Sequence, residues 1–247
     1  HLTRLGYRKD VDWIEYRITV PEPGGAEAER LHKLSEFILK RKHLHVATVH
    51  HKSEYGPFVR QVFELVNAAY APLYGVVELS DEQIERYANK FIPLVDPDFV
   101  CFVVDEQDQL VAFGVTALDP SVALKHSDGR LFPFGWAGVL NDLHHSDTLI
   151  MLLTAVRPDL QAEGINAVMM DHVCQSCNRH GVRFAETGPM LELNDHILAQ
   201  WKRLEKEQHK RRRCFIKDLD HGINAANAAA AAQAEAPEAA PAAESAE

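Results

Sequence analysis

The sequence is poor in cysteine, in basic charge and in long apolar runs, and each shortage excludes a class of protein. Four cysteines in 247 residues are too few for a disulfide framework, so we expect a reducing, cytoplasmic setting. A net charge of −10 argues against bulk nucleic-acid or membrane binding. No apolar stretch approaches the roughly 20 residues that cross a bilayer. A globular protein remains, and 46% hydrophobic with 25% charged residues fits that class.

Residues 221–247 lack almost every large apolar side chain. Ala, Pro, Glu and Gln dominate this segment, which has four Glu and no Lys or Arg. Such a composition cannot offset the entropy lost on ordering the chain. We therefore expect a disordered tail at 221–247, after a folded and only mildly acidic domain over residues 26–220.

Hydrophobic periodicity predicts alternating helices and strands. Helical spacing is found over 26–41, 55–70, from Ser80 to about 91, 134–144, about 165–180 and about 194–208. Strand-like runs cover 12–20, 44–49, 99–104, 110–118, 148–156, 182–190 and 212–219. Ser80 and Gln83 have the spacing of a capping box, and residues 119–133 are expected to form a loop.

The stretch from Thr148 to Asn194 reads as strand, tight turn, helix and strand. Its apolar first run stops at Arg157-Pro158, and Gly181 ends the helical pattern. The intervening turn would lie at the start of a helix, where unpaired backbone N–H groups point outward. Such a turn is a ready anion-binding site.

This stretch resembles the GCN5-related N-acetyltransferase family. The family motif is a strand followed by Gln or Arg, two residues, Gly, one residue, and Gly or Ala. Gln161 and Gly164 match it, whereas Asn166 stands where the second small residue belongs. The resemblance extends over about residues 44–219 and also rests on Glu186 in the next strand and Asn194 at the start of the next helix.

The resemblance implies an α/β fold with a mixed, mostly antiparallel sheet flanked by helices and a V-shaped split between two central strands. These strands would be 148–156 and 182–190. The cofactor would be acetyl-CoA or another acyl-CoA, with its pyrophosphate on the turn and its pantetheine in the split. The implied cofactor-binding residues are Leu153, Thr154, Ala155, Val156, Gln161, Ala162, Glu163, Gly164, Ile165, Asn166, Asn194 and Trp201.

The resemblance also implies a reaction, the transfer of an acyl group to an amine. A backbone N–H between Leu153 and Val156 would polarise the thioester carbonyl. Glu186 would be the base that deprotonates a small-molecule or peptide amine. Trp201 stands where the family often has a tyrosine acid, and an indole is not a useful acid. Two functions therefore stay open: an N-acyltransferase of unknown acceptor, and a degenerate protein that binds acyl-CoA or a partner without turnover.

The beginning of the chain resembles the last hairpin of the same family. Leu5-Gly6-Tyr7 precedes a strand-like run, as a Gly-aromatic pair does there. We therefore expect residues 1–25 to be the closing hairpin of an upstream unit plus a linker, and the chain to be the C-terminal unit of a tandem protein. Aminoacyl-tRNA-dependent peptide-bridge enzymes also pair two such units, but the basic surface that tRNA would need is confined here to one short run at 210–213.

Three other clusters favour ordinary structural roles. Cys174 and Cys177 lie inside a helical pattern with no second ligand pair, so we expect buried thiols and no metal. The histidines between 43 and 51 have no acidic partner in the pattern. The basic run at 210–213 is typical of a solvated helix end.

Overall fold

A computed structural model describes residues 1–92 and 95–218, so the expected tail at 221–247 lies outside the described residues. The chain forms two compact units: residues 1–13 with the segment from Arg212 onward, and residues 14–211. In the smaller unit, the guanidinium of Arg213 makes two hydrogen bonds, of 2.7 and 2.8 Å, to the buried carboxylate of Asp12. The candidate site lies within residues 14–211.

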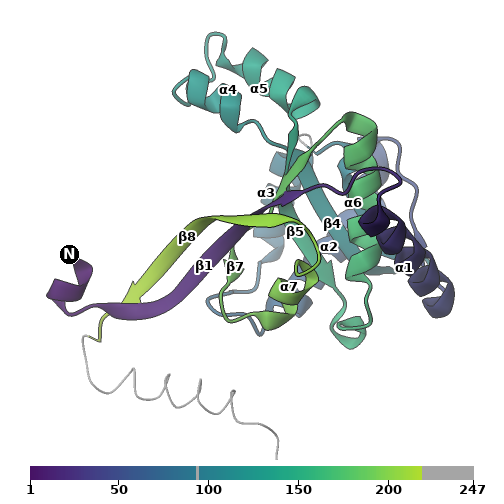
Figure 1. Cartoon of the computed structure of the whole chain (residues 1–247), viewed down its shortest axis with the longest axis horizontal. Coiled ribbons are helices and arrows are strands. Elements are labelled where there is room, and N and C mark those ends of the chain that lie inside the picture. Colours follow the sequence, from purple (N-terminus) through teal and green to yellow (C-terminus); the bar gives the residue numbers. More distant parts are fainter. Residues whose placement is uncertain (93–94, 219–247) are drawn as a thin grey trace, which may run out of the picture. The chain divides into compact units, whose positions relative to one another are not determined.

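The elements alternate as expected for an α/β fold (Figure 1). The strands are β1 (Arg8–Thr19), β2 (His45–Val46), β3 (Val100–Val104), β4 (Leu110–Leu118), β5 (Thr148–Val156), β6 (Phe184–Glu186), β7 (Met190–Leu191) and β8 (Lys206–Ile216). The α-helices are α1 (Ala26–Lys42), α2 (Gly56–Tyr70), α3 (Asp81–Phe91), α4 (Ser121–His126), α5 (Gly135–His145), α6 (Asn166–His180) and α7 (Asp195–Gln200). Short 3-10 turns are η1 (Leu2–Leu5), η2 (Lys52–Tyr55), η4 (Pro97–Phe99) and η5 (Pro158–Leu160).

One mixed sheet organises the fold. Its strand order is β2-β3-β4-β5-β6-β1-β7, and β8 pairs with β1. The pairs β2–β3, β3–β4, β4–β5 and β6–β1 are antiparallel, whereas β5–β6 is parallel. This confirms the predicted fold class, an α/β protein with a mostly antiparallel sheet flanked by helices.

Two apolar cores lie on opposite faces of the sheet. On one face, α1 and α6 lie side by side and cover a core that includes Leu149 and Val111, both fully buried (Figure 1). On the other face, α2 covers a core around Phe113, and the ring of Phe58 stacks on Phe102 with ring centroids 4.4 Å apart. Because each large side chain contributes roughly 1.5–3 kcal/mol when buried, these two cores fix the sheet between the helices.

Several local predictions are confirmed. Strand β5 has the predicted bounds, Thr148–Val156. Helix α6 ends where Gly181 adopts a left-handed φ of 70°, a conformation that glycine takes without steric cost. The capping box is present: the hydroxyl of Ser80 accepts a hydrogen bond from the backbone N–H of Gln83, whose side chain accepts one from the backbone N–H of Ser80.

Other boundaries were wrong for identifiable reasons. The predicted strand 182–190 divides into β6 and β7 at Gly188-Pro189, where proline has no N–H for a sheet ladder. The predicted helix 194–208 stops at Gln200, because the chain from Glu205 onward pairs with β1, beginning with a 2.9 Å hydrogen bond from Thr19 N–H to Glu205 C=O. The predicted loop 119–133 contains the short helix α4.

Strand β1 precedes the predicted domain boundary after residue 25, but it pairs with a strand that follows this boundary. It pairs with β6 through Arg17↔Glu186, Ile18↔Ala185 and Thr19↔Phe184. These residues thus belong to the same sheet as the predicted 26–220 domain. An upstream unit and a tandem arrangement stay predictions.

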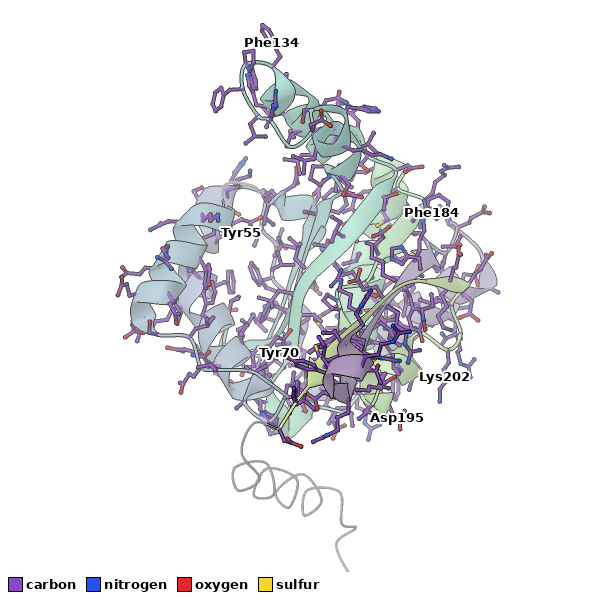
Figure 2. The ribbon with its side chains drawn as sticks, turned by 90° about the vertical axis from the view of Figure 1, so that its left-hand side faces the viewer. Tyr55, Tyr70, Phe134, Phe184, Asp195 and Lys202 are labelled. Carbon is purple, nitrogen blue, oxygen red and sulfur yellow. The ribbon has the colours of Figure 1, made fainter. Side chains whose placement is uncertain are left out.

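Helices α4 and α5 form a hairpin inserted between β4 and β5. They are joined by a 2.7 Å hydrogen bond from Ala123 N–H to the carboxylate of Asp142. Phe132 and Phe134 lie in the connection between the two helices, and each is about 80% exposed to solvent. Figure 2 shows Phe134 at the outer end of this hairpin. Within the described residues, no helix is both long enough and apolar enough to cross a bilayer.

Candidate functional site

One edge of strand β5 is paired along nearly its whole length, and the other edge is paired only at its start. It pairs with β4 from Leu149 to Val156, but with β6 only from Thr148 to Ile150. Leu153 faces Val115 and Met151 faces Thr116, so Leu152 is an extra residue that bulges from the ladder. Beyond Ile150 the strands β5 and β6 separate, which confirms the predicted split.

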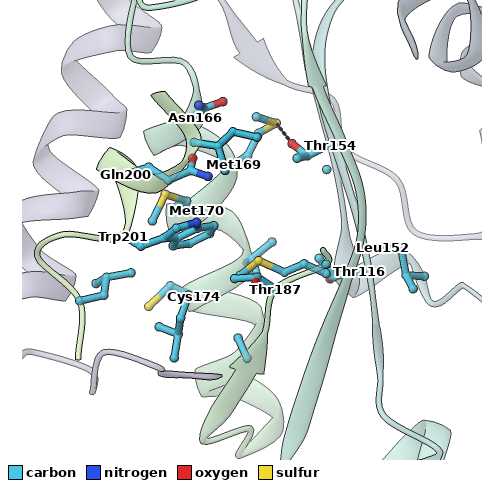
Figure 3. Close-up of a pocket in the computed structure, with 18 of the residues that line it drawn as sticks. Thr116, Leu152, Thr154, Asn166, Met169, Met170, Cys174, Thr187, Gln200 and Trp201 are labelled. Atoms are coloured by element: carbon cyan, nitrogen blue, oxygen red, sulfur yellow. Dashed lines mark hydrogen bonds between the residues drawn. The ribbon is translucent and has the colours of Figure 1, made fainter. Parts of the chain in front are cut away.

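A cavity of about 300 Å³ lies in the split, and its walls are mostly apolar (Figure 3). Strand β5 contributes Leu153 and Thr154, and α6 contributes Asn166 and Met169. The loop after β6 and helix α7 close the opposite side. A cavity of this size and character is within the range of small-ligand sites.

The turn that enters α6 supplies hydrogen-bond donors at one end of this cavity. Gln161 closes the turn by donating from Nε2 to the carbonyl of Val156 at 3.3 Å. Ala162 and Gly164 have left-handed φ values of 64° and 85°. Among the described residues, the backbone N–H groups of Ala162, Gly164, Ile165 and Asn166 have no hydrogen-bond acceptor. Because α6 begins there, its dipole favours an anion at the same place.

Glycine at position 164 avoids both backbone strain and a close contact with α1. A Cβ at this position would lie 3.0 Å from Cδ1 of Ile38 on α1. An L-residue at φ 85° would also be strained. A larger residue at position 164 would therefore require Ile38 to shift as well as a strained backbone.

Glu163 is directed to α1. Its carboxylate makes a 2.8 Å ion pair with Lys42, and this hydrogen bond holds the pKa of Glu163 below its usual range. Lys42 thus offsets a negative charge that would otherwise oppose an anion on the turn.

The predicted cofactor-binding residues divide into four groups. Leu153, Thr154, Asn166 and Trp201 line the cavity. Gln161, Ala162, Glu163 and Gly164 form the exposed turn. Ala155, Val156 and Ile165 have side chains buried in the two cores, so only their backbone groups could serve a ligand. Asn194 caps α7, accepting the backbone N–H of Ile197 at 3.2 Å, and is not part of the cavity wall.

Tyr70 is a cavity residue that sequence reasoning missed. Its hydroxyl donates a 2.6 Å hydrogen bond to the carbonyl of Thr154, and burial raises the pKa of Tyr70. Because the N–H of Arg157 points to Val111 on β4, alternation directs the backbone groups of Val156 and Thr154 toward the split. The only signal in the sequence was an aromatic side chain with a polar tip at the end of an apolar stripe.

Glu186 lies on the face of the sheet opposite to the cavity. Its neighbours Ala185 and Thr187 line the cavity, and successive strand side chains alternate between faces. The carboxylate of Glu186 is 2.9 Å from Nζ of Lys210, and this contact raises the pKa of Lys210. Nε2 of His209 is 3.6 Å from the same carboxylate. Its role as a base stays a prediction.

Trp201 forms a buried part of the cavity wall. The indole N–H donates to the sulfur of Met190 at 3.2 Å, and the side chain is 5% exposed. Cys174 and Cys177 are buried thiols of the same wall, with pKa values raised by burial to about 11 and about 12. Over residues 1–92 and 95–218, no group of three or more His, Cys, Asp or Glu could hold a metal ion.

Comparisons with known proteins place the fold. No family model matches the chain. Protein YghO of Escherichia coli (strain K12) is 24% identical over 225 residues, which cover 89% of this chain and 56% of that protein. A crystal structure of a GCN5-related N-acetyltransferase from Sphaerobacter thermophilus matches with a TM-score of 0.55 at 15% identity, covering 90% of this chain and 56% of that one.

A GCN5-related glucosamine N-acetyltransferase region of a fungal multi-domain β-N-acetylglucosaminidase matches with a TM-score of 0.52 at 11% identity, over 87% of this chain and 22% of that one. The chain thus spans about half the length of the relatives named first. At these identities the comparisons report on architecture. The chain has the fold of the GCN5-related N-acetyltransferases.

Proposed function

We propose that the split binds an acyl-CoA and that the protein transfers the acyl group to an amine. The observation that carries this proposal is the open half of β5, which faces a cavity whose far end meets the N-terminus of α6. A pyrophosphate on the turn would accept the N–H groups of Ala162, Gly164 and Asn166. The carbonyls of Thr154 and Val156 already accept hydrogen bonds from Tyr70 and Gln161, so an amide-containing chain in the split could pair with the backbone N–H groups of these two residues.

The reaction would form a C–N bond and break the C–S bond of the thioester. The amine must first lose a proton, and Glu186 is the proposed acceptor of that proton, for an amine that reaches the split from the face of the sheet opposite to the cavity. An N–H of β5 directed into the split, such as that of Val156, would stabilise the developing oxyanion. The sulfur leaves as a thiolate. The acceptor is a small-molecule or peptide amine, and the four free cysteines support the proposal of a cytoplasmic setting.

A second candidate function is acyl-CoA binding without turnover. Two contacts favour it. The carboxylate of Glu186 is engaged by Lys210, and Trp201 occupies the position of the usual acid with its indole N–H directed to Met190. Neither residue is prepared for proton transfer in this arrangement.

Two measurements separate these functions. Calorimetry with acetyl-CoA and with coenzyme A tests binding, and absence of heat at millimolar ligand would overturn both functions. Thiol release in the presence of candidate amines tests turnover. We expect Glu186→Gln to lower thiol release by about 10²-fold or more, whereas Glu207→Gln, at an exposed position of β8, keeps the parent rate. Equal rates in both variants would exclude Glu186 as the base.

A further inference from the structure

A second cavity lies on the opposite face of the sheet, between the sheet and helices α2 and α3. Its volume is about 430 Å³. Its wall includes Val62 of α2, Ala88 of α3 and Phe102 of β3, and it is almost wholly apolar. The hydroxyl of Tyr55, at the start of α2, is buried in this wall and has no hydrogen-bond partner among the described residues.

The two cavities adjoin at the bulge of β5. Val115, Leu152 and Leu153 line both of them. Leu152 is the extra residue of the ladder, and it remains 49% exposed although it is apolar. The second cavity thus begins beside the backbone groups that would hold the thioester.

An apolar cavity of this size needs an explanation, because protein interiors are normally close-packed. An engineered cavity of about 150 Å³ already binds benzene, and each CH₂ moved from water into an apolar site gains about 0.8 kcal/mol. An apolar group occupying about 430 Å³ would make the van der Waals contacts that the lining of an empty cavity lacks. Among the described residues, the polar side chains of the wall are those of Tyr55 and Tyr87, and the rest is apolar, so the wall favours a hydrocarbon.

We infer that the acyl donor carries a long hydrocarbon chain, whose tail passes the bulge at Leu152 and occupies the second cavity. This inference rests on the proposed binding of acyl-CoA in the split. It assigns the substrate class: a medium- or long-chain acyl-CoA in place of acetyl-CoA.

Calorimetry with a chain-length series of acyl-CoAs, each below its micelle concentration, tests the inference. From acetyl-CoA to octanoyl-CoA we expect the affinity to rise at least about tenfold, well below the ceiling set by the transfer energy of six CH₂ groups. Binding of acetyl-CoA with no gain for longer chains would overturn the inference and leave the proposed function intact. Absence of binding by coenzyme A and all its thioesters would overturn the proposed function itself.

Two variants that fill the second cavity test whether the hydrocarbon tail of the acyl donor lies there. Ala88→Phe and Val62→Phe narrow it from α3 and from α2, and each should lower the ratio of octanoyl-CoA to acetyl-CoA affinity about tenfold, removing most of the chain-length gain. Ala71→Phe, at an exposed position after α2, is the matched control and should keep the parent ratio. Thermal unfolding identifies a variant that fails to fold. Parent ratios in both folded cavity variants would contradict this placement of the tail.

Discussion

The two halves of β5 have similar apolar sequences and different surroundings. Residues 148–150 have a strand on each side, and Leu149 is fully buried between them. Residues 151–156 have a strand on one side and a cavity on the other. The difference arises from the neighbour, because β6 ends at Glu186 just before Gly188-Pro189. A uniform strand can therefore be structural in one half and available to a ligand in the other.

The largest expected effect is on the free energy of unfolding. It is tested by comparing Leu149 with Leu152, one leucine from each half of β5. Leu149→Ala should lower the free energy of unfolding by about 2–5 kcal/mol, because it opens a cavity in a closed core. Leu152→Ala should lower it by less than about 1 kcal/mol, because that side chain is already half exposed. Urea unfolding measures both. Equal losses would show that the two halves are packed alike.

The second comparison uses two glycines with left-handed φ. Gly164→Ala combines strain at φ 85° with a 3.0 Å contact to Ile38, whereas Gly24→Ala has similar strain at φ 75° and no atom within 4 Å. We expect both to lose about 1–2 kcal/mol of stability from the backbone term. Only Gly164→Ala should also weaken acetyl-CoA binding, by several-fold, because it displaces the turn. Equal affinities in the two variants would exclude the turn from the site.

The third expected effect is a loss of acetyl-CoA affinity without a loss of stability. Asn166→Asp places a negative charge at the N-terminus of α6, where it favours the helix by about 0.3–1 kcal/mol. The same charge repels a pyrophosphate, so we expect acetyl-CoA affinity to fall about tenfold while the melting temperature does not fall. Gln107→Glu, in an exposed turn distant in sequence, controls for net charge. Unchanged affinity in Asn166→Asp would contradict an anion site at the turn.

The smallest expected effect is on the pH dependence of stability, and it comes from a contact between α1 and α6. Nδ1 of His32 is 3.0 Å from the carboxylate of Asp171, and this hydrogen bond raises the pKa of His32. Glu36 and Gln175 also face the imidazole. Because the pKa is higher in the folded state, the contact stabilises the protein below about pH 6.5 and is lost as the pH rises through the folded pKa.

His32→Gln should remove this pH dependence and lower the melting temperature by about 1 °C at pH 5.5, a small effect because the imidazole is half exposed. Melting curves at pH 5.5 and 8 measure it. A difference between variant and parent that is larger at pH 8 would contradict the assignment.

Local sequence signals predicted the elements that depend on nearby residues. The capping residues Ser80 and Gln83, the terminating Gly181 and the bounds of β5 are determined by neighbours in the chain. The turn at Gln161 and Gly164 is of the same kind. These features were predictable because helix ends and tight turns have direct residue preferences.

Features that depend on distant pairing could not be predicted this way. The helix from Asn194 stops early because Glu205 pairs with Thr19, which is 186 positions away in the sequence. Tyr70 reaches Thr154 across 84 positions. Glu186 faces away from the cavity because of the register of β6, which a short strand sequence does not specify.

Amide hydrogen exchange of β5, followed by NMR with and without saturating acetyl-CoA, tests the central claim directly. If the open half binds the donor, the amide of Val156 becomes protected on binding, together with amides of the turn at Ala162 and Gly164. The amide of Leu149 lies in the half that is already paired on both sides and should not change. Binding that leaves Val156 and the turn unprotected would contradict the account.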